Sequence, residues 1–149
     1  AKDFVVLASS TKLLRNIDAL YRQRTNEQTE ITFISNEILE RLKQIHQVTD
    51  ERVTNWKFDR DFEALERTRK QLFTTDKRCL KISTIQSFKG WESPSVIVIL
   101  ESDLTLPNTT FRPMSPQTIY TAITRARENM YIINIGNDTY HNFFYNQTL

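Results

Sequence analysis

The sequence predicts an α/β fold in which a mostly parallel sheet is covered by helices on both faces. Short, mostly apolar runs, typical of strands buried on both faces, recur at 4–8, 96–100 and 130–135. Segments with apolar residues at helical spacing lie between these runs, and such alternation is the pattern of a parallel sheet. At 149 residues, 39% of them hydrophobic, the chain is expected to form a single domain, 1–149.

In the first half of the chain, hydroxyl side chains follow the first strand and suit the N-cap of a helix. Thr29–Ser35 alternates enough to predict a second strand, and Asn36 is placed to cap a second helix that ends near Gln47. A third helix is expected at 58–73, with a heavily charged face that we interpret as exposed to solvent. The residues behind these predictions are Ser9, Ser10 and Thr11 for the first cap, Leu13, Leu14, Ile17, Leu20 and Tyr21 for the first helix, Ile38, Leu39, Leu42 and Ile45 for the second, and Phe58, Phe62, Leu65, Leu72 and Phe73 for the third.

In the second half, Cys79–Thr84 and Val96–Leu100 predict buried strands, separated by a polar segment. A proline-bearing loop, Ser102–Pro113, precedes a helix that begins at Ser115 as N-cap, with Pro116 at its first position. This helix is expected to run to Arg127 and to bury one side. The last elements are a buried strand at Met130–Ile135 and a short aromatic helix at Tyr140–Tyr145.

The composition of the chain excludes several classes of function. The chain has two glycines, Gly90 and Gly136, so it contains neither G-x-G-x-x-G nor G-x-x-x-x-G-K-[ST] and has no phosphate-binding glycine loop of its own. A net charge of +2 is small for a dedicated nucleic-acid-binding domain, so such binding would need a local patch. A single cysteine, Cys79, excludes an internal disulfide and a Cys-rich zinc site. No apolar run approaches the ~18 residues of a membrane span, so we expect a cytoplasmic protein without a membrane partner.

Two other groups of residues have ordinary structural explanations. His46 and His141 are isolated from cysteine or acidic clusters at ligand spacing, so we expect no metal site. Trp56 and Phe58, beside Arg52, Lys57 and Arg60, could form a stacking and phosphate patch for a single strand. The expectation we favour is that these aromatic residues anchor a helix onto the sheet.

The segment Ser83–Glu92 directly follows the carboxyl end of a predicted strand, where ligands gather in parallel sheets. Its hydroxyls, an amide, Lys89 and Gly90 suit phosphate oxygens, although an ordinary connecting loop remains an alternative. The helix after Ser115 carries Arg125 and Arg127, which diverge by about 160° on a helical wheel and so cannot serve one small ligand together. One arginine is then free to meet an anion, and the other covers the sheet or pairs with a carboxylate.

Together these two segments resemble known motifs. Thr84-x-Gln86-x-x-Lys89-Gly90-Trp91-Glu92 resembles motif V of superfamily 1 helicases, T-x-H-x-x-K-G-L-E, and Tyr120-Thr121-Ala122-Ile123-Thr124-Arg125-Ala126-Arg127 resembles their motif VI. Their order, spacing and flanking strands agree, and the start of the chain is similar to the same domain of UvrD-type enzymes. The match extends well over 79–136 and loosely over 1–24. UvrD-type enzymes carry a large helical insertion before motif V, so we expect only a small one here, at about 25–78.

The resemblance implies a RecA-like domain without its own P-loop, the C-terminal motor domain of a UvrD/RecD-like DNA helicase and a fragment of a longer protein. ATP and Mg²⁺ would be held mainly by an N-terminal RecA-like partner domain, and the isolated chain is not expected to hydrolyse ATP. Arg125 would be the catalytic arginine finger, and Gly90, Glu92 and Thr124 would join it in binding ATP. The residues implied to contact single-stranded DNA are Thr84, Gln86, Ser87 and Lys89.

The sequence departs from motif V at Gln86, which replaces histidine, and at Trp91, which replaces leucine. An amide can still donate to a phosphate, whereas Trp91 either fills the core or packs near a base or ribose. Motif VI is closer to RecD-like members and motif V to UvrD, which leaves the direction of translocation open. Two other functions remain: a non-catalytic nucleic-acid-binding or scaffolding module derived from a helicase domain, and a small nucleotide-sensing domain.

Overall fold

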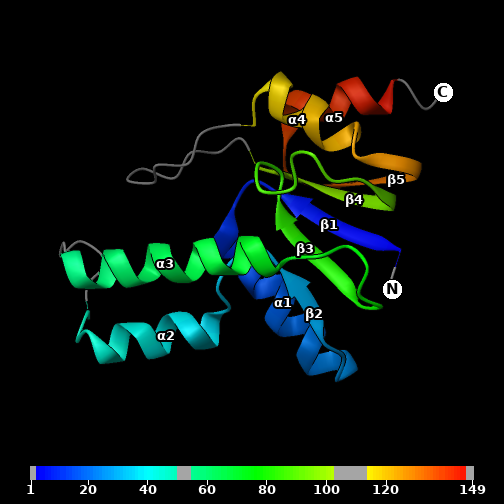
Figure 1. Cartoon of the computed structure of the whole chain (residues 1–149). Coiled ribbons are helices and arrows are strands. Elements are labelled where there is room, and N and C mark those ends of the chain that lie inside the picture. The colour runs from blue at the N-terminus through cyan, green and yellow to red at the C-terminus, as the bar shows by residue number, and fades with distance from the viewer. Residues whose placement is uncertain (1–2, 50–54, 103–113, 147–149) are drawn as a thin grey trace.

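The computed structural model describes residues 3–49, 55–102 and 114–146. Over these residues one sheet of five parallel strands has the order β2-β3-β1-β4-β5, with helices on both faces (Figure 1), so the predicted fold class is confirmed. The strands are β1 (Phe4–Ala8), β2 (Thr29–Ile31), β3 (Leu80–Thr84), β4 (Ser93–Glu101) and β5 (Ala126–Ile135). The helices are α1 (Thr11–Thr25), α2 (Asn36–Ile45), α3 (Trp56–Leu72), α4 (Pro116–Ile123) and α5 (Asp138–Tyr145).

Each face of the sheet builds its own part of the core. On one face α1 packs over β1 and β3 through an apolar side that includes Leu14, which is fully buried. On the other face α4 and α5 pack over β4 and β5, and Phe73 and Phe88 complete this second cluster. Fully buried β1 residues contribute to both clusters, which explains why the run at 4–8 is apolar at every position.

The connections on the two sides of β1 run in opposite directions. From β1 the chain passes through α1 to β2, whereas from β3 it crosses β1 to reach β4. The carboxyl ends of β1 and β3 are neighbours, with Ala8 opposite Thr84. This is the switch point at which open parallel sheets leave a crevice for ligands.

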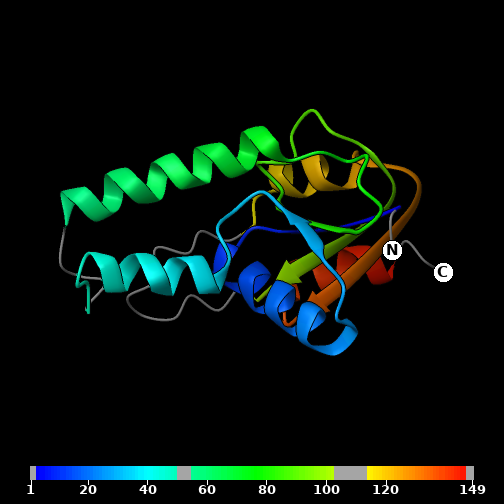
Figure 2. The same cartoon turned by 60° about the horizontal axis from the view of Figure 1, so that its bottom comes forward.

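Two helices extend beyond the sheet. Figures 1 and 2 both show α2 and α3 side by side, projecting past the carboxyl ends of the strands. His46, at the end of α2, meets α3 edge-on at the Phe58 ring, and its Nε2 lies 3.1 Å from an Asp61 oxygen, while Phe58 also stacks on Phe62 within α3. The range 25–78, expected to be a helical insertion, therefore holds this helical pair together with β2, which pairs with β3.

The predicted second strand is too long. β2 ends at Ile31, and the residues after it remain buried while the chain turns toward α2. The predicted cap is also wrong by one residue, because Ser35 and not Asn36 has extended dihedrals and accepts from the amide of Ile38. Asn36 is the first residue of the helix itself. The alternation of apolar and polar residues continues past Ile31, the last residue of β2 that pairs with β3. A prediction from this pattern alone therefore made the strand too long.

The helix after Ser115 is shorter than expected, which overturns the helical-wheel argument for its two arginines. Ser115 caps it as predicted, but α4 ends at Ile123 and β5 begins at Ala126. The Thr124 hydroxyl donates to the carbonyls of Tyr120 and Thr121, and such side-chain bonds compete with the helix backbone. Arg125 therefore lies in a tight turn and Arg127 on a strand.

The strand predicted at 130–135 is present within β5, but the prediction that it is buried is wrong. Among the described strands β5 pairs with β4 alone and forms an edge of the sheet. Tyr131, Ile133 and Ile135 consequently keep 48–50% of their surface exposed. Most of the expected loop at 102–113 lies outside the described residues. No helix in the described part of the chain is both long and apolar enough to span a membrane.

Candidate functional site

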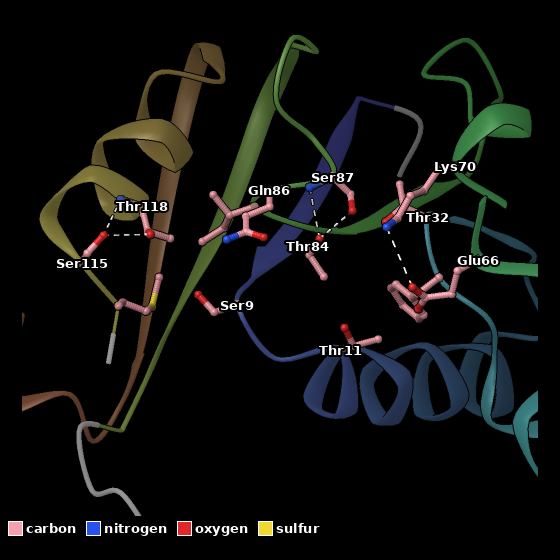
Figure 3. A pocket seen from close by; sticks show the side chains of 13 residues that line it. Ser9, Thr11, Thr32, Glu66, Lys70, Thr84, Gln86, Ser87, Ser115 and Thr118 are labelled. Carbon is pink, nitrogen blue, oxygen red and sulfur yellow. Dashed lines mark hydrogen bonds and ion pairs between the residues drawn. The ribbon is translucent and has the colours of Figure 1, made fainter. Parts of the chain in front are cut away.

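A groove of about 620 Å³ lies at the carboxyl ends of the strands (Figure 3). The loops after β1, β2 and β3 form its floor, the first turn of α4 closes one side, and the last third of α3 closes the other. Most lining side chains carry a hydroxyl or an amide. The residues are Ser9, Thr11, Thr32, Phe33, Glu66, Lys70, Thr84, Ile85, Gln86, Ser87, Met114, Ser115 and Thr118.

Three of the four residues predicted to bind nucleic acid lie together in this groove: Thr84, Gln86 and Ser87. Thr84 donates to the Ser87 hydroxyl over 2.9 Å and accepts from the Ser87 amide over 3.2 Å, a local turn that fixes both side chains. Gln86 is exposed, so its amide is free to donate into the groove. The fourth residue, Lys89, is exposed farther along the turn and does not line the groove.

Sequence reasoning missed the hydroxyls supplied by the other loops. The Ser9 hydroxyl is buried at the groove and has no hydrogen-bond partner among the described residues, which is unusual for a buried polar atom. Ser115 and Thr118 share a hydrogen bond of 3.0 Å at the start of α4. The sequence did carry a signal for Ser9, because this hydroxyl residue comes directly after the predicted strand 4–8. Residues that follow parallel strands meet at the carboxyl ends of the sheet, where ligands bind.

A buried carboxylate supports the groove from behind. Glu101, at the end of β4, is 7% exposed, and its two oxygens accept from the amides of Ser9 and Ser10 at the start of α1 over 3.0–3.2 Å. An anion at a helix N-terminus is favourable. Desolvation nevertheless dominates and raises the pKa of Glu101 above that of an ordinary carboxyl group, while the two amide hydrogen bonds oppose the shift.

This raised pKa gives the domain a measurable pH dependence. Below the ordinary carboxyl pKa, Glu101 is protonated in both the folded and the unfolded chain, and it makes its full contribution to stability. As the pH rises through the raised folded value, the buried charge must form and that contribution is lost. We expect the free energy of unfolding of the unsubstituted chain, relative to Glu101→Gln, to increase as the pH falls from 7 toward 4. Urea unfolding of both proteins across this range measures it, and a flat or opposite difference would contradict it.

The residues predicted to bind ATP gather at the other ends of the strands from the groove, the amino ends, which we call the amino edge of the sheet. Glu92 comes just before β4 and Arg125 just before β5, so both lie at the amino ends of the strands. Their segments are joined through the backbone, where the amide of Ser93 donates to the carbonyl of Arg125 over 3.0 Å. Glu92 forms an exposed ion pair of 2.9 Å with Arg127, which matches the expectation that one arginine pairs with a carboxylate.

The Arg125 guanidinium lies across the carboxyl end of α4. Its Nε donates to the carbonyl of Thr121 over 3.1 Å and a terminal nitrogen donates to the Thr124 hydroxyl over 3.1 Å. The other terminal nitrogen lies 3.4 Å from the carbonyl of Trp91. A cation there is favoured by the helix dipole and by the unpaired carbonyls of the last turn. The arginine is held at the surface, partly exposed, beside the loop that contains Gly90.

Gly90 has φ +92°, in the region that side-chain-bearing residues rarely adopt, and a Cβ there would meet no atom within 4 Å. The turn geometry therefore requires glycine, and the space beside it is open. A guanidinium, a hydroxyl and open backbone fit the oxygens of a polyphosphate but form only one side of a site. Among the described residues no group of three His, Cys, Asp or Glu could hold a metal ion.

Comparison with known protein families gives one match. The sequence profile of the viral superfamily 1 RNA helicase core domain matches residues 8–134. The match includes the groove residues from β1 onward and both segments at the amino edge, Gly90–Glu92 and Thr124–Arg127. No curated protein sequence matches the chain.

Proposed function

Because the chain belongs to the viral superfamily 1 RNA helicase core family, we propose that it serves as the second motor domain of an ATP-dependent helicase. In this proposal the hydroxyl-lined groove binds a single strand of nucleic acid. The amino edge of the sheet completes an ATP site whose other half belongs to an N-terminal RecA-like domain of the same protein.

The proposal depends above all on one segment that contacts both sites. Thr84 and Ser87 lie in the groove, and a few residues later the carbonyl of Trp91 meets Arg125. Between them Phe88 is fully buried and packs edge-on against Phe73, which also contacts the Trp91 ring. Because the centre of this segment is packed into a dense core, which transmits strain, a shift at the groove end of the segment is expected to be passed on to the Arg125 end. A motor domain needs such a link between strand binding and nucleotide binding.

The groove has the chemistry of a strand-binding surface. Hydroxyl and amide groups donate to phosphate oxygens, and both sugars and phosphates offer acceptors along a single strand. The one ion pair at the groove, Lys70 with Glu66 at 3.8 Å, leaves the lining without net charge. Binding there would depend on hydrogen bonds more than on charge, as the modest net charge of the chain suggests.

At the amino edge each residue has a distinct proposed role. ATP supplies the γ-phosphate that is cleaved, with Mg²⁺ held mainly by the partner domain. Arg125 would donate to that phosphate in the transition state, and Thr124, which now accepts from Arg125, would hold the guanidinium or bind a phosphate oxygen. Glu92 and the open backbone at Gly90 would contact the ribose or polyphosphate, and Arg127 would keep the Glu92 carboxylate in place.

The motif resemblance points to single-stranded DNA as the ligand, whereas the family description names RNA. The hydroxyls of the groove can form hydrogen bonds with a ribose 2′-hydroxyl, which is the group that distinguishes RNA from DNA. Fluorescence anisotropy with oligothymidylate and oligouridylate of equal length decides between them. Tighter binding of oligothymidylate supports a DNA helicase, and tighter binding of oligouridylate supports an RNA helicase.

Removing the groove amide tests strand binding itself. We expect Gln86→Ala to weaken the binding of a short oligonucleotide about 3- to 10-fold, because one exposed hydrogen bond of about 0.5–1.5 kcal/mol is lost. Anisotropy titration at fixed salt concentration measures the change. Gln23→Ala, the same substitution on the exposed side of α1, is the matched control and should bind as the unsubstituted chain does. Equal affinities for all three proteins would remove the groove from the proposal.

A further inference from the structure

The α2–α3 pair is not anchored as the sequence suggested. Phe58 packs within the pair, against Phe62 and His46, and not onto the sheet. Trp56 packs little at all, because 66% of its surface is exposed at the far end of α3. Arg52 lies outside the described residues. In the described part of the chain this exposed indole contacts no other aromatic ring and lies beside the cations of Lys57 and Arg60.

Trp56 is one end of a polar stripe along the exposed side of α3. With about 100° between successive residues, five positions spaced by four, three, four and three residues fall within about 80° of one another. We call these five residues the α3 stripe: Trp56, Arg60, Glu63, Arg67 and Lys70. The half-buried aromatic side of the same helix, which includes Phe58 and Phe62, lies on the opposite side, where Phe58 meets His46 at the end of α2.

The stripe is continuous with the groove. Lys70, its last residue, lines the groove beside Glu66 (Figure 3). From Lys70 to Trp56 the helix rises about 21 Å, at about 1.5 Å per residue. At about 3.4 Å per stacked nucleotide this length accommodates about six nucleotides. A strand that leaves the groove past Lys70 would therefore meet the stripe along its whole length.

The charges of the stripe favour an anionic occupant. Its three cations face one acid, Glu63, and Lys57 adds a further positive charge beside Trp56. Arg67 has no carboxylate within ion-pair distance among the described residues, whereas Arg60 pairs with Asp61 at 2.9 Å and Lys70 with Glu66 at 3.8 Å. At the tip, Lys57 Nζ and Arg60 Cζ lie 5.7 and 5.6 Å from the centre of the Trp56 ring. Cations beside an exposed aromatic ring form the usual platform for a single strand.

We propose that the α3 stripe extends the groove into a longer single-strand binding site, in which Arg67 and Lys70 contact phosphates and Trp56 stacks on a base at the tip. The inference rests on the proposed function, because the groove supplies the near part of the strand. It assigns a strand-binding role to a helix outside the two motif segments.

The test uses whichever homopolymer, oligothymidylate or oligouridylate, binds the chain more tightly, and compares two lengths of it, about four nucleotides to fill the groove and about twelve to reach the tip as well. We expect Trp56→Ala to weaken binding of the longer strand about 5-fold or more, since a base loses its aromatic platform. Binding of the shorter strand should stay within about twofold of the unsubstituted chain. Arg67→Gln should also lower the salt dependence of longer-strand binding, by about 0.7 in the log–log slope.

A control variant lies on the same helix. Arg69 is about 160° away from Arg67 around α3 and lines a separate groove with Glu30 and Arg41, so Arg69→Gln removes the same charge from the other side. It should change neither affinity. In Trp91→Phe, which leaves Trp56 as the one indole, the longer strand should quench the fluorescence and the shorter should not.

The results separate the inference from the proposed function. If both lengths bind, but Trp56→Ala and Arg67→Gln match the unsubstituted chain on the longer strand, the stripe does not bind nucleic acid and the groove still does. The exposed Trp56 would then belong to a protein contact. If the unsubstituted chain binds neither length, the proposed groove fails and the stripe falls with it.

Discussion

Replacing Arg125 with alanine should lower ATP turnover about 10³- to 10⁵-fold, the usual effect of losing an arginine finger. The guanidinium is held at the carboxyl end of α4 by oxygens of Thr121, Thr124 and Trp91, so it is already positioned at the surface. The charge it supplies matters most in the transition state, and the loss should therefore fall on kcat. Steady-state hydrolysis by a protein in which this chain is joined to the proposed P-loop domain measures it.

The Arg125→Ala variant should keep its fold, because the bonds it loses lie at a partly exposed helix end. Arg125→Lys retains the charge without the planar guanidinium and should recover only part of the turnover. Arg24→Ala, which removes an exposed arginine from the last turn of α1, is the control and should hydrolyse ATP normally. Turnover within tenfold of normal in Arg125→Ala would disprove the arginine-finger role of this residue.

Truncating Phe88 to alanine should lower the free energy of unfolding by about 3–5 kcal/mol, as for other fully buried phenylalanines. That is a large part of the about 5–15 kcal/mol that stabilises a typical domain. The ring fixes the centre of the segment between Thr84 and Glu92, so its loss should also disorder both ends of that segment. Urea unfolding measures the stability, and anisotropy titration at low temperature measures oligonucleotide binding by the molecules that stay folded.

A milder variant separates these two effects. Phe88→Leu keeps most of the apolar volume and should cost less than half as much stability as Phe88→Ala. If the segment transmits movement between the sites, Phe88→Leu should still weaken oligonucleotide binding, even though the residue does not line the groove. Normal binding in Phe88→Leu would show that the core holds the segment without linking its two ends.

Sequence reasoning predicted the elements whose signals are local. The apolar runs at 4–8 and 96–100 gave strands with nearly correct bounds, and Ser115 with Pro116 marked the start of α4. The pattern of motif V singled out Thr84, Gln86 and Ser87 at the end of a predicted strand, and the structure brings them into one groove. These predictions needed only the identity of neighbouring residues.

The predictions that failed needed information from distant parts of the chain. Arg125 and Arg127 read as helical because nothing in their own residues shows that the Ser93 amide binds the carbonyl of Arg125 and starts a strand there. The exposure of Ile133 depends on which strands and helices lie beside β5, and an apolar run looks the same at a sheet edge as in its centre. The far side of the groove, at Glu66 and Lys70, comes from a helix whose charges looked merely solvated.

The position of β1 in the sheet also affects how this domain folds while it is being synthesised. β1 is the central strand, yet both of its neighbours come much later in the chain, and Phe4 pairs beside Ser95, about 90 residues on. Contacts so distant in sequence slow folding. At the usual ribosomal rate of about 5–20 residues per second, β1 waits about 5 to 18 s for β4. A nascent chain therefore carries its most apolar strand unpaired for seconds, which makes early protection by a chaperone valuable during translation.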